Sequence, residues 1–335
     1  MNSKERFQKV LEGSVPDRTP VFPLLMSFSA KRYGVSYREF ASNGRVLAEA
    51  QLSAREKYPI DAITACSDAF RIAADLGGAI VFPETKPPSL SEPLVKNKED
   101  FLRLKKPDVL NPKGRMRDRV NALAEMVRAV GDECMVLGWV DMPFAEACSL
   151  CGVTEFLMML YDEPGLAHGI LGFLADIVAE FAAAQLEAGA PMIGAGDAAA
   201  SLISAEAYRE FALPYEKRVC EAVHKAGGLL KLHICGNTSH IMADMTALDA
   251  DLYNVDHLVN FDLAMKNYTA HGKAFKGNLD PVEDILFSTP EECRKKAAAC
   301  VEKAKGMKYI LSPGCEVPEG TPDEVFLAFC DAVNG

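Results

Sequence analysis

Three residues combine side-chain types and a spacing that suit a metal ion: His233 and Cys235 in LLKLHICGN, and Cys315 in YILSPGCEVP. Each segment opens with a short apolar run that is typical of a buried strand. Side chains alternate along a strand, so His233 and Cys235 point the same way. One imidazole and two thiolates suit zinc, and three protein ligands leave a fourth position open for a substrate atom, as in catalytic zinc sites.

Short apolar runs alternate with amphipathic, helix-like stretches along the whole chain. This alternation is typical of an α/β fold and predicts a (β/α)8 barrel. A doubly wound sheet would normally carry a glycine-rich phosphate loop after its first strand, and VFPLLMSFSAKRYG has none. The eight predicted strands are Val21–Met26, Ala62–Cys66, Cys134–Val140, Met192–Gly196, Leu229–His233, Leu252–Val255, Ala274–Gly277 and Tyr309–Leu311.

The chain shows no internal repeat and no linker between domains. We therefore expect residues 1–335 to form a single barrel domain. A charged, amphipathic segment at about residues 1–18 predicts a helical lead-in to the barrel. A stretch rich in proline and glycine, at about residues 75–111, predicts an excursion between the second and third strands.

The barrel prediction brings the three metal-binding candidates together. Active sites of such barrels lie at the carboxyl ends of the strands. His233 and Cys235 end the fifth predicted strand, and Cys315 follows the eighth, about 80 residues later. Glu316 is next to Cys315 and could be a further ligand or could only orient the site. A structural zinc site is the alternative, but such sites are closed by four protein ligands.

Acidic residues follow several of the same strands. We expect Asp68, after the second strand, and Asp197, after the fourth, to touch the substrate as catalytic residues. Asp280 is expected to bond the second ring nitrogen of His233. Some of these side chains could instead cap the helices that follow. Two more polar residues at this end are Asp256 and His257.

The remaining cysteines fit simpler interpretations. Cys148 and Cys151 have the CxxC spacing of metal or redox pairs, but no second pair accompanies them. Ten cysteines without a secretory signal favour free thiols in a reducing cytoplasm. The chain has no uncharged apolar stretch of the length, about 18 residues, that a membrane helix requires. The formal net charge of −11 argues against a nucleic-acid partner.

Several segments together resemble the uroporphyrinogen decarboxylase superfamily over essentially the whole chain. This resemblance implies the same barrel fold. The superfamily has a decarboxylase branch and a branch of zinc-dependent, corrinoid-linked methyltransferases. The segments that carry the resemblance are VFPLLM, TACSDAF, GAPMIGAGDAA, YREFALPYEKRV, KLHICGN and GNLDP.

The sequence can be compared with each branch. Decarboxylases carry arginines after the first strand, in an MRQAGR-like segment that holds the substrate carboxylates. Here MSFSA has no arginine, and the nearest are Arg18 and Arg32. Asp68 does match the aspartate of the decarboxylase FSD segment. The His-x-Cys pair and the late Cys315 instead match the methyltransferases, so the resemblance favours methyl transfer.

The methyltransferase branch implies zinc and a methylated corrinoid (cobalamin) as cofactors. A zinc-bound thiolate stays nucleophilic, and a thiol such as coenzyme M is the expected methyl acceptor. The Asp-x-His-x-x-Gly motif of corrinoid-carrying domains does not occur in the chain. The resemblance therefore implies that a separate corrinoid protein supplies the cofactor. Two alternatives remain: demethylation of a methoxy-aromatic or methylamine donor, and decarboxylation of uroporphyrinogen.

Overall fold

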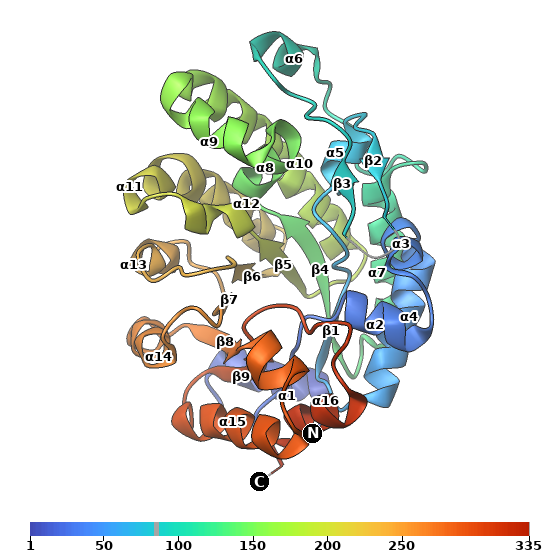
Figure 1. The fold of residues 1–335 in the computed structure, drawn as a ribbon, viewed down its shortest axis with the longest axis vertical. Coiled ribbons are helices and arrows are strands. Elements are labelled where there is room, and N and C mark those ends of the chain that lie inside the picture. Colours follow the sequence, from blue (N-terminus) through green and yellow to red (C-terminus); the bar gives the residue numbers. More distant parts are fainter. Residues whose placement is uncertain (84–86, 335) are drawn as a thin grey trace.

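A curled sheet of seven parallel strands forms the centre of the molecule (Figure 1). The computed structural model describes residues 1–83 and 87–334. Within them, the strands pair in the order in which they occur in the chain, as a barrel requires. They are β1 (Ala62–Thr64), β4 (Met135–Asp141), β5 (Met192–Gly196), β6 (Leu229–His233), β7 (Leu252–Asn254), β8 (Ala274–Leu279) and β9 (Tyr309–Pro313).

Residues 20–24 close the ring between the two edge strands. Val21 forms a parallel bridge with Leu311 of β9. On the other side, the backbone N–H of Asp61, next to β1, donates to the carbonyl of Val21 over 2.8 Å. The predicted strand at Val21–Met26 is reduced to isolated bridges because Pro23 cannot donate a ladder hydrogen bond. With this segment as its eighth member, the sheet forms the predicted (β/α)8 barrel.

A helix connects each strand to the next and covers the outside of the barrel (Figure 1). The connecting helices are α4 (Gly44–Lys57), α7 (Arg115–Val130), α10 (Pro164–Glu187), α12 (Leu213–Lys225), α13 (Met242–Thr246), α14 (Phe261–Ala270) and α15 (Pro290–Lys303), and α16 (Asp323–Asp331) follows the last strand. Shorter helices lie in the connections: α2 (Ser27–Tyr33), α3 (Tyr37–Ser42), α5 (Arg71–Asp75), α8 (Pro143–Cys151), α9 (Val153–Asp162), η1 (Ala198–Leu202), α11 (Ala205–Ala207), η2 (Tyr208–Ala212) and η3 (Pro281–Leu286).

The amino-terminal helix α1 (Ser3–Glu12) closes one end of the barrel. Phe7 and Val10 on this helix pack with inward-facing residues of the strands, including Leu137 and Met192. In Figure 1 this helix lies behind the sheet, so the view is onto the opposite, carboxyl-terminal end. The stretch at 75–111 carries β2 (Ile80–Val81), β3 (Ser89–Leu90) and α6 (Lys98–Arg103).

One helix, α10, is long and apolar enough to cross a membrane by length and composition. Asp176 and Glu180 lie within this helix, so it is not an uncharged apolar stretch of the kind that the sequence was expected to lack. Of its most apolar window, 56% is buried inside the fold. The buried residues include Ile170, Leu174, Ile177 and Phe181, which belong to the main hydrophobic cluster. A core helix of a barrel passes the same test, so α10 is explained by its packing.

Candidate metal centre

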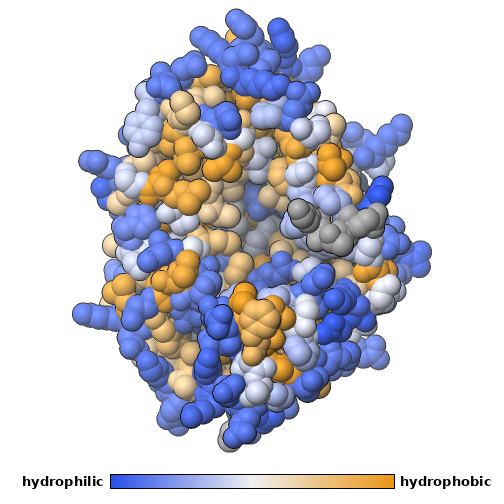
Figure 2. Space-filling model, in the orientation of Figure 1, coloured by the Kyte–Doolittle hydropathy of each residue, from blue (hydrophilic) through white to orange (hydrophobic). Residues whose placement is uncertain are grey.

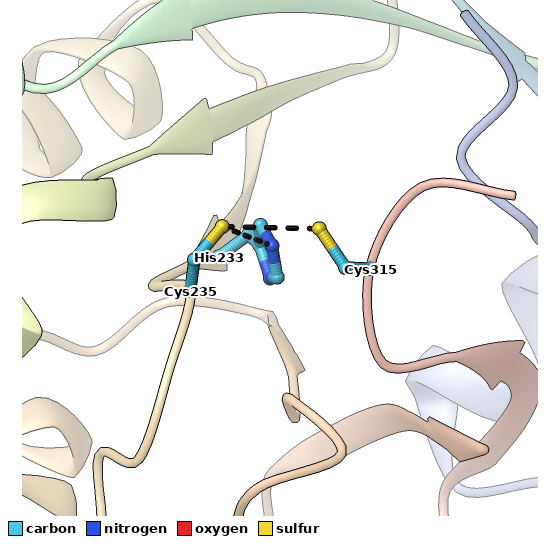
Figure 3. Close-up of side chains that lie close together, drawn as sticks. All are labelled: His233, Cys235 and Cys315. Carbon is cyan, nitrogen blue, oxygen red and sulfur yellow. Dashed lines mark hydrogen bonds between the residues drawn. The ribbon is translucent and has the colours of Figure 1, made fainter. Parts of the chain in front are cut away.

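His233, Cys235 and Cys315 meet at the carboxyl-terminal end of the barrel (Figure 3). Their ligand atoms all lie within 4.8 Å of one another. The Cys235 sulfur is 3.1 Å from Nε2 of His233 and 3.9 Å from the Cys315 sulfur. Among the described residues, this is the one group of three or more such side chains close enough to hold a metal ion. One nitrogen and two sulfurs suit zinc, and three ligands leave a position open.

Local backbone geometry brings the two halves of this group together. His233 ends β6, and its Nδ1 faces the carbonyl of Asn254 on the neighbouring strand at 3.5 Å. Cys315 follows Gly314, which lies directly against the backbone of the loop after β7. A Cβ atom on Gly314 would lie 2.3 Å from the backbone nitrogen of His257. Only glycine permits this approach, which sets the position of Cys315.

The thiols of Cys235 and Cys315 lie within hydrogen-bonding distance of each other. The hydrogen bond from Cys235 lowers the pKa of Cys315 to about 3, although burial opposes this shift. The same contact, together with burial, raises the pKa of Cys235 well above its ordinary value. The contact thus favours ionisation of Cys315 over Cys235, and a metal bound to both sulfurs would displace the protons that remain.

A buried lysine lies beneath the cluster, and sequence reasoning missed it. Lys231 precedes His233 by two residues and shares its face of β6. Its ammonium group is fully buried, has no hydrogen-bond partner, and lies 4.5 Å from the centre of the Trp139 ring. Burial lowers the pKa of Lys231 to about 8, against the attraction of the nearby thiols. A cation at this depth reduces the cost of burying thiolates.

Asp68 is held in an ion pair with Arg115 and is not part of the metal-binding group. Both of its carboxylate oxygens accept hydrogen bonds from Arg115, at 2.9 and 2.8 Å. Nearby, Arg71 pairs with Asp141 at the end of β4 and is almost completely buried. Both arginines lie outside the first barrel segment, where the decarboxylase arginines were expected, so neither was predicted. Neither Arg71 nor Arg115 follows a strand in the way that marked the other candidates.

Asp197 lies on the outer side of the sheet. Its neighbours Ile193 and Ala195 on alternate positions of β5 belong to the cluster that packs against the helices. The Asp197 carboxylate is fully buried beside Glu216 of α12. Burial raises the pKa of both groups, and the Glu216 charge raises that of Asp197 further. The structure thus places Asp197 beside Glu216, and a role in substrate contact stays a prediction.

Asp280 does not bond His233, and that expectation is wrong. The carboxylate of Asp280 accepts from the backbone N–H groups of Val282 and Glu283 and so caps η3. It also lies 3.5 Å from Nε2 of His257, whose Nδ1 is 3.2 Å from Asp256. Asp280 therefore acts as a helix cap, which was the alternative prediction for these acidic residues.

Glu316 is outside the group of three metal-binding side chains and binds the start of α2. Its carboxylate accepts hydrogen bonds from the backbone N–H and the hydroxyl of Ser27, both at 2.7 Å. Burial raises the pKa of Glu316 to about 7, although these two bonds oppose the shift. These contacts fit an orienting role, because they attach the loop that carries Cys315 to the first barrel segment. Cys148 and Cys151, in contrast, are buried in α8 as core residues.

A parallel barrel with polar and metal-binding groups at the carboxyl ends of its strands has the architecture of an enzyme. The model of the family "Uroporphyrinogen decarboxylase (URO-D)" matches residues 2–335, and the chain belongs to this family. A uroporphyrinogen decarboxylase of Synechococcus sp. (strain CC9605) is 28% identical over 303 residues, which cover 88% of this chain and 84% of the relative. One of Polaromonas sp. (strain JS666 / ATCC BAA-500) is 26% identical over 355 residues, covering 97% and 94%.

Solved structures share the fold. A methyltransferase from Methanosarcina mazei superposes with a TM-score of 0.88 at 22% identity, covering 100% of this chain and 98% of that one. A B12-independent methionine synthase from Shewanella sp. W3-18-1 gives a TM-score of 0.60 at 14% identity, covering 87% and 85%. At these identities the likeness establishes the barrel architecture.

Proposed function

We propose that the chain is a zinc-dependent methyltransferase that moves a methyl group between a corrinoid on a separate protein and a small molecule. The first candidate for the small molecule is a thiol such as coenzyme M. The observation that carries this proposal is the meeting of His233, Cys235 and Cys315 with ligand atoms within 4.8 Å. A decarboxylation needs no such group, whereas thiol activation does.

The residues present fit zinc. His233 would ligate through Nε2, since this is the nitrogen that faces the Cys235 sulfur while Nδ1 faces a carbonyl. Cys235 and Cys315 would supply two thiolates. Bound there, zinc would supply a position at which a substrate thiol loses its proton and stays nucleophilic. Two thiolates and a neutral imidazole balance the charge of the ion, which favours a soft sulfur ligand over an ether oxygen.

The chain's own residues would orient and seal this position. The carbonyl of Asn254 fixes the ring of His233. Lys231 places a positive charge beneath the thiolates and keeps water out of the barrel interior together with Trp139. Glu316 and Gly314 hold the loop of Cys315 in place. The match to a structure named a methyltransferase supports this proposal over the full length of the chain.

The flow of methyl could also run the other way, from a methoxy-aromatic or methylamine donor to the corrinoid. Zinc and corrinoid are kept in that version, and only the small molecule differs. An assay that offers methylcobalamin with a panel of thiols, and cob(I)alamin with methoxy-aromatic and methylamine donors, separates the two directions. Turnover only from the donors would select the reverse reaction.

Uroporphyrinogen decarboxylation is the second candidate. The names of the curated relatives favour it, and so does Asp68 with its partner Arg115. This reaction requires no metal, so turnover of uroporphyrinogen by chelator-treated protein would select it. Methyl transfer that disappears with the metal and returns when zinc is added would exclude it as the main activity.

A further inference from the structure

The ammonium group of Lys231 lies inside the barrel without a hydrogen-bond partner. Among residues 1–83 and 87–334, no group accepts a hydrogen bond from it, and its nearest aromatic neighbour is the Trp139 ring at 4.5 Å. Figure 2 views the carboxyl-terminal end of the barrel, which is hollowed at its centre, and Lys231 lies below that surface because none of it is exposed. A buried polar group without a partner costs free energy, so this charge requires an explanation.

Lys231 lies close to the metal-binding sulfurs. It precedes His233 by two residues on β6, and both side chains therefore lie on the face of the strand that points into the barrel. The sulfurs of Cys235 and Cys315 attract its charge, and so does the buried thiol of Cys66, just after β1. The charge of Lys231 thus acts on both thiolates that a metal would bind.

The other charged groups around the cluster each have a partner of their own. The pairs are Lys276 with the carbonyl of Phe22 at 2.7 Å, Glu316 with the hydroxyl of Ser27 at 2.7 Å, Asp256 with the backbone N–H of Leu258 at 2.9 Å, and Arg71 with Asp141. Lys231 differs from these groups, because only sulfur ligands of the metal lie in a position to balance its charge.

The charges of the loaded site can be counted. The two positive charges of zinc are balanced by the thiolates of Cys235 and Cys315, and the imidazole of His233 is neutral. Lys231 then adds one positive charge that nothing balances. We propose that the charge of Lys231 makes the open metal position selective for an anionic sulfur, so that the small molecule is a thiol and not a neutral ether or amine donor. This inference rests on the methyl transfer proposed above and selects between its two directions.

The selection follows from the charge that each ligand brings. A thiol that binds loses its proton to the solvent, and its thiolate then makes the interior neutral. A methoxy-aromatic brings no charge, and a methylamine brings either none or a positive one, so both would leave a net charge where ions are poorly solvated. Buried charges interact strongly and are little screened by salt. Lys231 therefore determines specificity through its charge and need not touch the ligand.

Cobalt(II) in place of zinc makes ligand binding visible without turnover, because a bound thiolate increases the sulfur-to-cobalt absorption. Cobalt-loaded protein is titrated with 2-mercaptoethanol, which binds as an anion, and with imidazole, which binds as a neutral ligand. We expect Lys231→Met to weaken the binding of 2-mercaptoethanol at least about tenfold at pH 7, since a buried unit charge is lost. Imidazole binding should be unaltered or stronger. Lys276→Met removes a second fully buried lysine, which has its own partner, and should leave both affinities unaltered.

Two results would overturn the proposal. Unaltered thiol binding in Lys231→Met would show that the charge does not act on the ligand, and equal losses of thiol and imidazole binding would assign Lys231 a packing role alone. Lys231→Gln, which is also neutral but keeps a polar end, gives the same comparison where the methionine variant does not fold. Circular dichroism and cobalt content are measured on every sample.

Failure of the proposed function gives a different pattern from failure of this inference. Wild-type protein that takes up no metal, or that takes up metal and binds no thiol, contradicts the methyltransferase function itself. Intact metal and thiol binding in wild type and in both Lys231 variants contradicts only the role of Lys231.

Discussion

The sulfur atoms of Cys235 and Cys315 lie 3.9 Å apart although 80 residues separate them in the chain. The barrel causes this proximity, because each cysteine follows the carboxyl end of a different parallel strand, β6 or β9. Between these strands stand only β7 and β8 in the sheet. The open position beside the two sulfurs and His233 thus faces the end of the barrel at which enzymes of this architecture bind substrates.

Removing either sulfur should remove the metal. Cys235→Ser and Cys315→Ser should each lose most of the zinc, about one ion per chain in the wild type, because a neutral hydroxyl is a poor zinc ligand. Cys300→Ser, on α15 and outside the cluster, is the matched control and should keep it. Metal content by mass spectrometry, with circular dichroism for the fold, makes the comparison. Stoichiometric zinc in Cys315→Ser would count against the site.

Gly314→Ala should weaken metal binding and leave the fold largely intact. The added Cβ would lie 2.3 Å from the backbone nitrogen of His257, so the loop must move and take Cys315 with it. We expect zinc affinity to fall by about 10–100-fold, as for other changes that misorient a ligand. Gly320→Ala, in the same segment but 3.3 Å from a flexible leucine side chain, should bind zinc normally. A competition titration with a chromogenic chelator measures both, and equal affinities would refute the structural role of Gly314.

The ion pair between Asp68 and Arg115 should make the free energy of unfolding fall as the pH is lowered below about 4. Burial alone would raise the pKa of Asp68, but the hydrogen bonds and charge of Arg115 hold it below the ordinary value of 3.8. The pair thus stabilises the fold fully above about pH 4, and this contribution is lost as the pH falls toward the folded-state pKa. Arg115→Met should cost about 3 kcal/mol at pH 7, since it leaves a buried charge unpaired. Urea unfolding at pH 7 and pH 3 tests this, and an Arg115→Met protein that loses as much stability in acid as wild type would disprove it.

The buried pair of Asp197 and Glu216 should have the opposite pH dependence. Burial raises the pKa of both carboxyls in the folded state. Their contribution to stability is therefore complete below the ordinary pKa values, and it is lost as the pH rises toward the folded values. Glu216→Gln cannot ionise and keeps an oxygen near Tyr208, so it should raise the unfolding free energy at pH 8 by about 1 kcal/mol or more. Urea unfolding of both proteins at pH 5 and pH 8 tests this prediction. A Glu216→Gln protein that is no more stable than wild type at pH 8 would contradict the raised pKa values of the two carboxyls.

The strands that position the cluster could be predicted from the sequence because their apolar runs are short and sharply bounded. Met192–Gly196 and Leu229–His233 are found with the predicted bounds. The three metal-binding candidates also meet as predicted, since alternation along a strand and the barrel topology fix where they point. The first barrel segment differs because Pro23 interrupts its ladder, a local effect that an apolar pattern does not register.

Side-chain pairing was harder to predict. Which group bonds an aspartate depends on contacts between distant segments, and Asp280 found a helix cap and His257 instead of His233. Arg115 reaches Asp68 from the start of α7, 47 residues further along the chain, and no local pattern marks it. Lys231 and Lys276 are fully buried inside the barrel. They could not be predicted there because charged residues are rarely buried. Each stays buried next to an aromatic ring, Trp139 or Phe22.

The most direct test of the proposed function is transfer of methyl from methylcobalamin to a thiol, followed by the absorbance change of the corrinoid, in wild-type and Cys315→Ala protein. Zinc-loaded wild type should turn over coenzyme M or another thiol of the panel. The rate of methyl transfer by Cys315→Ala should be lower by at least about a hundredfold, because the loss of one metal ligand removes the activated thiolate. Equal rates in the two proteins, or activity in wild type stripped of metal, would contradict the account.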